Sequence, residues 1–363
     1  MSPIPEKSYV NSLVEEIGAC ARDGLEKPVK RSLTSIYFGG GTPSLFSSDS
    51  IARIIETSMS APSSTSDVEI TLEVNPKTSD MQKLDALYIT GVNRLSVGVQ
   101  SFQDKFLQKL GRVHCSADIF SLINEARSVG FSNISLDLIF GILDQTLDDW
   151  ERDLDSALSL RPQHLSVYNL TIEPNTIFYE RQRQGSIVLP DEDVQVRMYL
   201  LAQEKLSEVG YEQYEISNFA LPGFRCRHNE GYWTLQEYLG FGAGAHSYLK
   251  EGLPECRWGI RWQNIPNPYE YISLVTHNSS VAAEKEELTR EEAIREAIFL
   301  GLRRMDGIDF DDFKTRFGLS LEETFQDVIL HLLKEDLVSI NGGRLRLTTQ
   351  GILLSNVVFL NFF

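Results

Sequence analysis

A run of three glycines at residues 39–41 is the stretch of this sequence best suited to receive a ligand. It follows a β-branched and aromatic run of strand type, Thr34–Phe38, and precedes Thr42 and Pro43. A loop without side chains exposes its backbone amides to a ligand, and the Thr42 hydroxyl adds a further donor. The alternative is an ordinary strand-to-helix turn in which the glycines only adopt backbone angles that other residues avoid.

Polar side chains mark the other strand-like runs as well. Glu73 and Gln100 lie near the ends of two runs, and Asp137 lies inside an otherwise apolar one. The predicted strands are Thr34–Gly40, Val68–Asn75, Asn93–Gln100, Asn133–Gly141 and His164–Leu170. Parallel α/β sheets bind ligands at the carboxyl ends of their strands, so polar groups that recur there favour a binding site. Each group taken singly has a structural alternative, and Arg112 is either a solvated loop charge or a clamp for a carboxylate.

Helical periodicity separates these runs. The apolar spacing predicts helices over Tyr9–Ala21, Ser50–Met59, Met81–Tyr88, Ile119–Val129 and Leu147–Leu160. Alternating strands and helices with glycine-bounded turns are typical of an α/β fold in which helices cover a parallel sheet. The elements needed to bring the polar residues to one edge are therefore predicted from the pattern alone.

The composition limits the classes of function. Of 363 residues 42% are hydrophobic, which supports a sizeable core, and 51 acidic against 34 basic residues give a net charge of −17. This acidity argues against a nucleic-acid partner, which needs clustered Lys and Arg. No window has the apolar length of a membrane span, so we expect no span and a cytoplasmic protein, or a mitochondrial one if a longer precursor exists.

The end of the chain is typical of a small separate module. Its predicted elements are helices at Thr289–Arg303, Phe310–Phe317 and Leu321–Leu333 and a hairpin within Leu337–Thr348. This order is that of a winged helix. DNA binding is not expected, because acidic residues crowd the second and third helices: Asp309, Asp311, Asp312, Glu322, Glu323 and Asp327.

Together the glycine loop, the polar residues of the strand-like runs and Arg112 resemble the motifs of radical S-adenosylmethionine (SAM) enzymes of the coproporphyrinogen-dehydrogenase-like branch. The resemblance implies a partial (β/α)6 barrel whose first strand is missing here. It also implies SAM and a 4Fe-4S cluster as cofactors. The positions that match cofactor-contacting residues of the family are Gly40, Gly41, Thr42, Glu73, Gln100, Arg112 and Asp137.

Two later segments resemble the HemW group of haem chaperones within this branch. They are Cys226–Trp233, with the pattern His-Asn-x-x-Tyr-Trp, and Tyr238–Tyr248, with Gly-x-Gly-Ala-x-Ala-His. The resemblance implies haem binding and delivery to haem-accepting proteins, with His228 and His246 as candidate axial ligands. Taken without the family, each is better explained as a structural imidazole than as a metal ligand. The predicted domains are a barrel at 1–220, a HemW-specific segment at 221–285 and the winged-helix-like domain at 286–363.

One feature of the family pattern is absent from this sequence. A radical SAM protein holds its cluster with a Cys-x-x-x-Cys-x-x-Cys loop, whereas Cys20, Cys115, Cys226 and Cys256 lie far apart. We expect these four to be reduced, mostly structural thiols, and we assign no metal ligand or catalytic residue. Either the sequence is shortened at its N-terminus or the chain cannot cleave SAM reductively. The alternatives to a haem chaperone are an oxygen-independent coproporphyrinogen III oxidase and a non-catalytic remnant.

Overall fold

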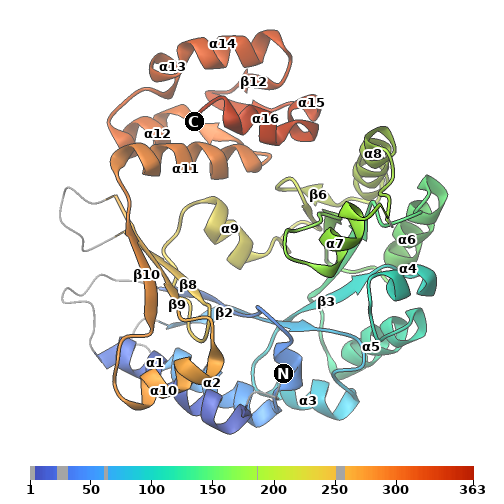
Figure 1. Cartoon of the computed structure of the whole chain (residues 1–363), viewed down its shortest axis with the longest axis vertical. Coiled ribbons are helices and arrows are strands. Elements are labelled where there is room, and N and C mark those ends of the chain that lie inside the picture. The colour runs from blue at the N-terminus through green and yellow to red at the C-terminus, as the bar shows by residue number, and fades with distance from the viewer. Residues whose placement is uncertain (1–4, 23–31, 61–63, 186, 251–257) are drawn as a thin grey trace. The chain divides into compact units, whose positions relative to one another are not determined.

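The computed structural model describes residues 5–22, 32–60, 64–185, 187–250 and 258–363 (Figure 1). The chain divides into two compact units. One consists of Met1–Ile36, Phe46–Glu69 and Arg227–Phe363, and the other of Tyr37–Leu45 and Ile70–Cys226. We refer to them as the terminal unit and the central unit and describe each by itself.

A seven-stranded sheet forms the curled half-barrel of the α/β fold, in the order β1-β2-β3-β4-β5-β7-β6. The strands are β1 Leu33–Phe38, β2 Ser64–Val74, β3 Arg94–Gln100, β4 Ile134–Phe140, β5 His164–Asn169, β6 Glu212–Gln213 and β7 Asn218–Ala220. Neighbours from β2 to β5 are parallel, as the sequence predicts. The antiparallel pairing of β7 with β5 and β6 is a further feature that the sequence pattern did not reveal.

The helices of the central unit are α3 Met81–Ile89, α4 Asp104–Lys109, α5 Ser116–Val129, α6 Leu147–Ser159, α7 Ile177–Arg183 and α8 Glu192–Glu208. Figure 1 shows α3, α5 and α6 along one side of the strands. Side chains alternate between the two faces of a strand. In β3, Leu95, Val97 and Val99 therefore share one face, and Arg94 and Ser96 share the other. The three apolar side chains are buried, and we call the opposite, polar face of the sheet its inner face.

The terminal unit begins with α1 Glu6–Arg22 and α2 Ser48–Met59, which pack against each other, and α10 Pro268–Thr276 also packs on α1. The Glu6 carboxylate accepts hydrogen bonds from the amide and hydroxyl of Ser47, the N-cap residue of α2. Three strands, β8 His246–Leu249, β9 Ile260–Asn264 and β10 Ala282–Glu287, form an antiparallel sheet in the order β10-β9-β8. The short helix α9 spans Arg227–Trp233.

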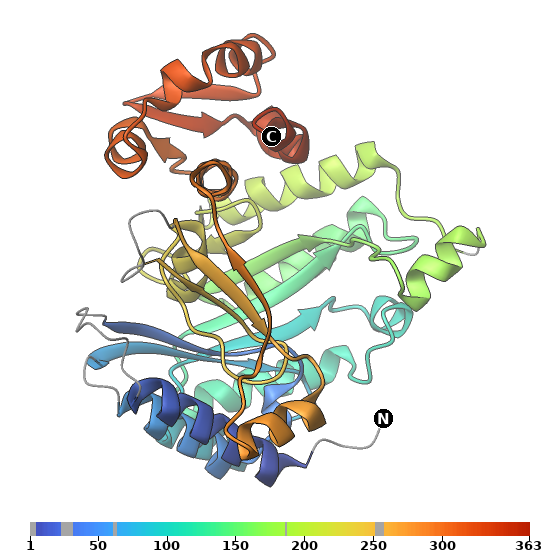
Figure 2. The same ribbon diagram turned by 60° about the vertical axis from the view of Figure 1, so that its left-hand side comes forward.

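The C-terminal part of this unit has the predicted winged-helix elements (Figure 2). They are α11 Arg290–Arg303, β11 Ile308–Asp309, α12 Phe310–Phe317, α13 Leu321–Thr324, α14 Gln326–Lys334, β12 Val338–Asn341 and β13 Arg344–Leu347. The hairpin is confirmed, because β12 and β13 pair through a turn in which Gly342 and Gly343 have φ of 60° and 72°. The predicted third helix is interrupted at Phe325, and α15 Thr349–Leu353 and α16 Ser355–Leu360 were not predicted.

Within the described ranges, no helix combines the length and the apolar character needed to cross a membrane.

Candidate functional site

The glycine loop lies in the central unit, directly after β1, and its three glycines are exposed. Gly40 has φ of 77°, and a Cβ added to Gly40 or Gly41 would meet no atom within 4 Å. A Cβ on Gly39, in contrast, would lie 2.7 Å from Cε1 of Tyr37 and 2.8 Å from Oε1 of Glu73. Gly39 thus permits the close approach of Glu73, and the next two glycines leave an open, backbone-lined surface for a ligand.

Glu73 lies beside this surface near the end of β2. The Tyr37 hydroxyl donates to its Oε1 over 2.9 Å, and the Gly40 amide donates to the same carboxylate. Burial, together with the charge of Asp137, raises the pKa of Glu73, although these two hydrogen bonds oppose the shift. Burial also raises the pKa of Tyr37, so Tyr37 stays a hydrogen-bond donor. The result is a fixed acceptor next to an open loop, which suits an ammonium group.

Asp137 lies on the same inner face of the sheet. Strand register pairs Glu73 with Ser96 and Asp137 with Ser166. The Ser96 hydroxyl donates to the two carboxylate oxygens of Asp137 over 3.1 and 3.3 Å, and the Ser166 hydroxyl donates as well. Burial raises the pKa of Asp137, and the nearby Arg94 charge opposes this rise. A row of polar groups therefore crosses neighbouring strands on one face.

Gln100 ends β3 close to residues from two other loops. A Cβ on Gly98 would lie 2.6 Å from Oδ1 of Asn75 and 3.0 Å from Nε2 of Gln100, so only glycine fits between these amides. Nδ2 of Asn75 donates to Oγ1 of Thr42 over 3.4 Å. The structure thus brings Thr42 and Gln100 close to Asn75 at the carboxyl ends of the strands, and Glu73 and Asp137 lie on the inner face of the neighbouring strands.

Arg112 is exposed in the loop between α4 and α5. Nζ of Lys77, just after β2, donates to the Val113 carbonyl over 3.2 Å, and Nε2 of His114 lies 3.4 Å from the Val99 carbonyl oxygen of β3. The loop is therefore attached to the same edge of the sheet. Within the described part of the chain, the Arg112 guanidinium has no ion-pair partner, so its charge is available to an anion.

Sequence reasoning missed three members of this site: Tyr37, Ser96 and Ser166. The sequence held a signal for Tyr37, which precedes Gly39 by two positions. Residues two positions apart in a strand lie on the same face. Ser96 and Ser166 follow only from the strand register, which a single sequence does not reveal.

His228 lies in the terminal unit, half-buried in α9. Its ring meets Tyr232 edge to face at a centroid distance of 4.7 Å, and Tyr232 meets Tyr238 in the same way at 4.6 Å. The helix start is anchored to β2 by Arg227, whose amide donates to Oε1 of Glu69 over 3.0 Å. His228 is thus held at one end of an aromatic row.

His246 is exposed at the first position of β8, and a glycine segment leads into it. Gly242 has φ of 98°, and a Cβ there would lie 2.7 Å from the Tyr9 hydroxyl. The Glu16 carboxylate of α1 accepts hydrogen bonds from the Gly242 amide, from Nδ2 of Asn264 and from the Tyr271 hydroxyl, over 2.9, 2.7 and 2.7 Å. The glycine motif therefore serves close packing on α1, and this packing positions His246.

The residues of this chain differ in how well they fit SAM and the 4Fe-4S cluster, the two cofactors that the family resemblance implies. The open glycine loop, the Glu73 carboxylate and the exposed Arg112 fit an amino acid moiety such as that of SAM. The cysteines do not fit a 4Fe-4S cluster: Cys226 is buried in the central unit, and Cys256 lies outside the described residues. Among the residues that the structure describes, no group of three His, Cys, Asp or Glu could hold a metal ion.

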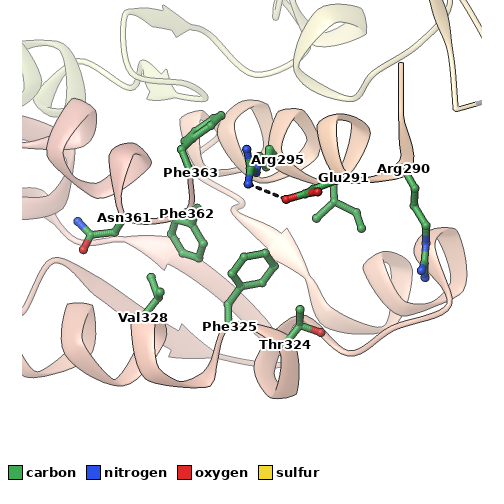
Figure 3. A pocket seen from close by; sticks show the side chains of 10 residues that line it. Arg290, Glu291, Arg295, Thr324, Phe325, Val328, Asn361, Phe362 and Phe363 are labelled. Atoms are coloured by element: carbon green, nitrogen blue, oxygen red, sulfur yellow. Dashed lines mark hydrogen bonds and ion pairs between the residues drawn. The ribbon is translucent and has the colours of Figure 1, made fainter. Parts of the chain in front are cut away.

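A pocket lies in the C-terminal module between α11, the start of α14 and the chain end (Figure 3). It is lined by Phe325, Phe362 and Phe363 and by two arginines. Both arginines are already engaged, because Arg295 pairs with Glu291 over 2.6 Å and Arg290 donates to the Phe317 carbonyl. We therefore assign no ligand to this pocket.

Comparison with known proteins gives two matching family models. The radical SAM superfamily matches residues 19–157, and the HemN C-terminal domain matches residues 288–354. The curated heme chaperone HemW of Bacillus subtilis is 39% identical over 98% of this chain and 91% of its own length. Heme chaperone HemW of Lactococcus lactis is 34% identical over 100% of this chain and 91% of its own length.

Among solved structures, coproporphyrinogen III oxidase (HemN) from Escherichia coli, a radical SAM enzyme, is similar with a TM-score of 0.80. The match covers 98% of this chain and 83% of the other, at 24% sequence identity. At this identity the likeness shows the fold alone.

Proposed function

The chain belongs to the heme chaperone HemW family, and from this we propose that it binds haem and delivers it to haem-accepting proteins. The observation that carries the proposal is the 39% identity that runs over 98% of the chain, and so includes the segments around both candidate histidines. The likeness to coproporphyrinogen III oxidase concerns the fold alone.

For haem we propose His228 and His246 as axial ligands, since a neutral imidazole is a common ligand of haem iron. The exposure of His246 and the aromatic row beside His228 support this choice. The closed packing of the glycine segment on α1 gives His246 a fixed position.

For SAM we propose a site made of Gly40, Gly41, Thr42, Glu73, Gln100, Arg112 and Asp137. Glu73 would accept from the ammonium of the methionine moiety, and Arg112 would pair with its carboxylate. SAM supplies a sulfonium whose carbon substituents can be transferred or released. The residues of this chain bind and orient SAM, and no reaction on a 4Fe-4S cluster is proposed because the cysteines present do not fit one.

The three-domain division and a cytoplasmic location stay predictions.

The test is a haemin titration of the full chain, followed by the Soret band. We expect a shifted band that saturates near one haem per chain. The double variant His228→Ala, His246→Ala should bind at least about tenfold more weakly, the loss of roughly 1.4 kcal/mol or more. His277→Ala is the matched control, because this histidine is exposed and its ring contacts the Ser273 carbonyl at the end of α10.

An unshifted Soret band for the unmodified chain would contradict haem binding. A double variant that titrates like the unmodified chain would contradict the two ligands while leaving haem binding in place.

A further inference from the structure

The backbone at Gln100 is unusual for a residue with a side chain. Its φ is 67°, in the left-handed region that residues other than glycine rarely adopt. The Ser101 amide donates to the Val99 carbonyl over 2.9 Å, which closes a three-residue γ-turn around Gln100. A γ-turn with positive φ is strained, so the surrounding structure must hold it.

Asp153 of α6 is the group that holds it. Its side chain is fully buried, and three consecutive residues, beginning with the last residue of the turn, donate to its carboxylate. The donors are the Ser101 hydroxyl over 2.8 Å, the Phe102 amide over 2.8 Å and Nε2 of Gln103 over 3.2 Å. Nε2 of Gln145, from the loop before α6, adds a longer contact of 3.4 Å. A buried carboxylate is retained only where such donors offset its desolvation.

The helix that carries Asp153 is itself fixed at several points. Its first turn is closed by a capping box between Thr146 and Asp149, and Asp149 also pairs with Lys105 of α4 over 2.7 Å. Nε1 of the buried Trp150 donates to the Met198 carbonyl of α8 over 2.8 Å. The carboxylate that meets the turn is therefore presented by a rigid element.

We propose that Asp153 is a positioning residue for SAM binding: it holds the γ-turn that directs Gln100 toward the cofactor site. This inference rests on the proposed SAM site and names a residue that no cofactor would touch. Asp153 acts only through Gln100, so its contribution to affinity must depend on the Gln100 side chain.

The experiment measures SAM affinity by calorimetry on the full chain, together with amide exchange at Ser101 and Phe102. Asp153→Asn keeps the volume but weakens the acceptor, so we expect at least a fivefold higher Kd and at least tenfold faster exchange of both amides. Leu154→Ala is the control: this neighbouring side chain is fully buried, and its truncation destabilises α6 but keeps the Asp153 carboxylate. It should leave the Kd within twofold.

A double-mutant cycle tests whether Asp153 affects SAM affinity through the Gln100 side chain. In a Gln100→Gly background, where glycine adopts the left-handed turn without strain, Asp153→Asn should change the Kd by less than twofold. A Kd unchanged by Asp153→Asn in the original background, or an equal loss in both backgrounds, would overturn the inference. An unmodified chain that binds no SAM at millimolar concentration would overturn the SAM site itself and the inference with it.

Discussion

At the scale of single residues, Glu73 combines burial with a functional charge. One oxygen is occupied by the Tyr37 hydroxyl, and the Gly40 amide also donates to the carboxylate. Burial raises its pKa above the ordinary value of 4.5, which means that the folded chain holds this proton more tightly than the unfolded chain. The ionised form of Glu73 that binding needs at neutral pH therefore lowers the free energy of unfolding. Such a loss of stability is common at binding sites.

Replacing Glu73 with Gln separates the two effects. The Glu73→Gln variant lacks the buried charge, so we expect its melting temperature at pH 7.5 to stay equal or rise. Its SAM affinity should fall at least tenfold, because the acceptor for the ammonium loses its charge. Calorimetry and thermal unfolding provide the two readouts, and Asp85→Asn on the exposed side of α3 is the control.

The pH dependence has a defined sign. Above the raised pKa of Glu73 the carboxylate is ionised, and SAM affinity should be at its highest. As pH falls through this pKa, the carboxyl becomes neutral and SAM affinity should decline. The stability contributed by this group runs the other way and increases as pH falls. Undiminished SAM affinity in the Glu73→Gln variant would show that Glu73 does not receive the ammonium.

At the scale of elements, the segment before β8 depends on α1. Glu16 accepts three hydrogen bonds there, from the Gly242 amide, the Asn264 side chain and the Tyr271 hydroxyl. These partners are more than 220 positions away in the sequence, so no local pattern indicates them. The prediction of a helix from Tyr9 was correct, but its role in placing His246 was visible only in the structure.

Glu16→Ala should therefore destabilise the terminal unit strongly. It leaves buried donors without an acceptor, at about 1–3 kcal/mol for each group that water cannot reach. We expect a loss of about 3 kcal/mol in chemical denaturation, and weaker haem binding through His246. Glu15→Ala, at the exposed neighbouring position, is the control and should cost less than about 0.5 kcal/mol. Equal stabilities of the two variants would refute the role of Glu16.

At the scale of the whole molecule, local patterns predicted strands β1 to β5, helices α1 to α3, α5, α6, α11 and α12, and the hairpin, because each depends on periodicity or turn residues. Strands β6 to β11 and the long helix α8 were not predicted. They also predicted Gly40, Glu73, Gln100 and Asp137 as neighbours, since parallel strands place their ends together. The division into units was not predictable, because one unit joins Met1–Ile36 with Arg227–Phe363. Ser96, Ser166 and Asp153 were missed for the same reason: their roles depend on register and packing between distant segments.

Haem delivery is the central function proposed for this chain, and a haem-transfer experiment tests it most directly. The haem-loaded chain is mixed with an excess of a haem-free globin, and the Soret band of each protein is followed over time. We predict that the band of the loaded chain disappears as that of the globin rises, faster than when the same haem is supplied on serum albumin. Haem that stays on this chain, or that leaves no faster than from albumin, would contradict a chaperone function.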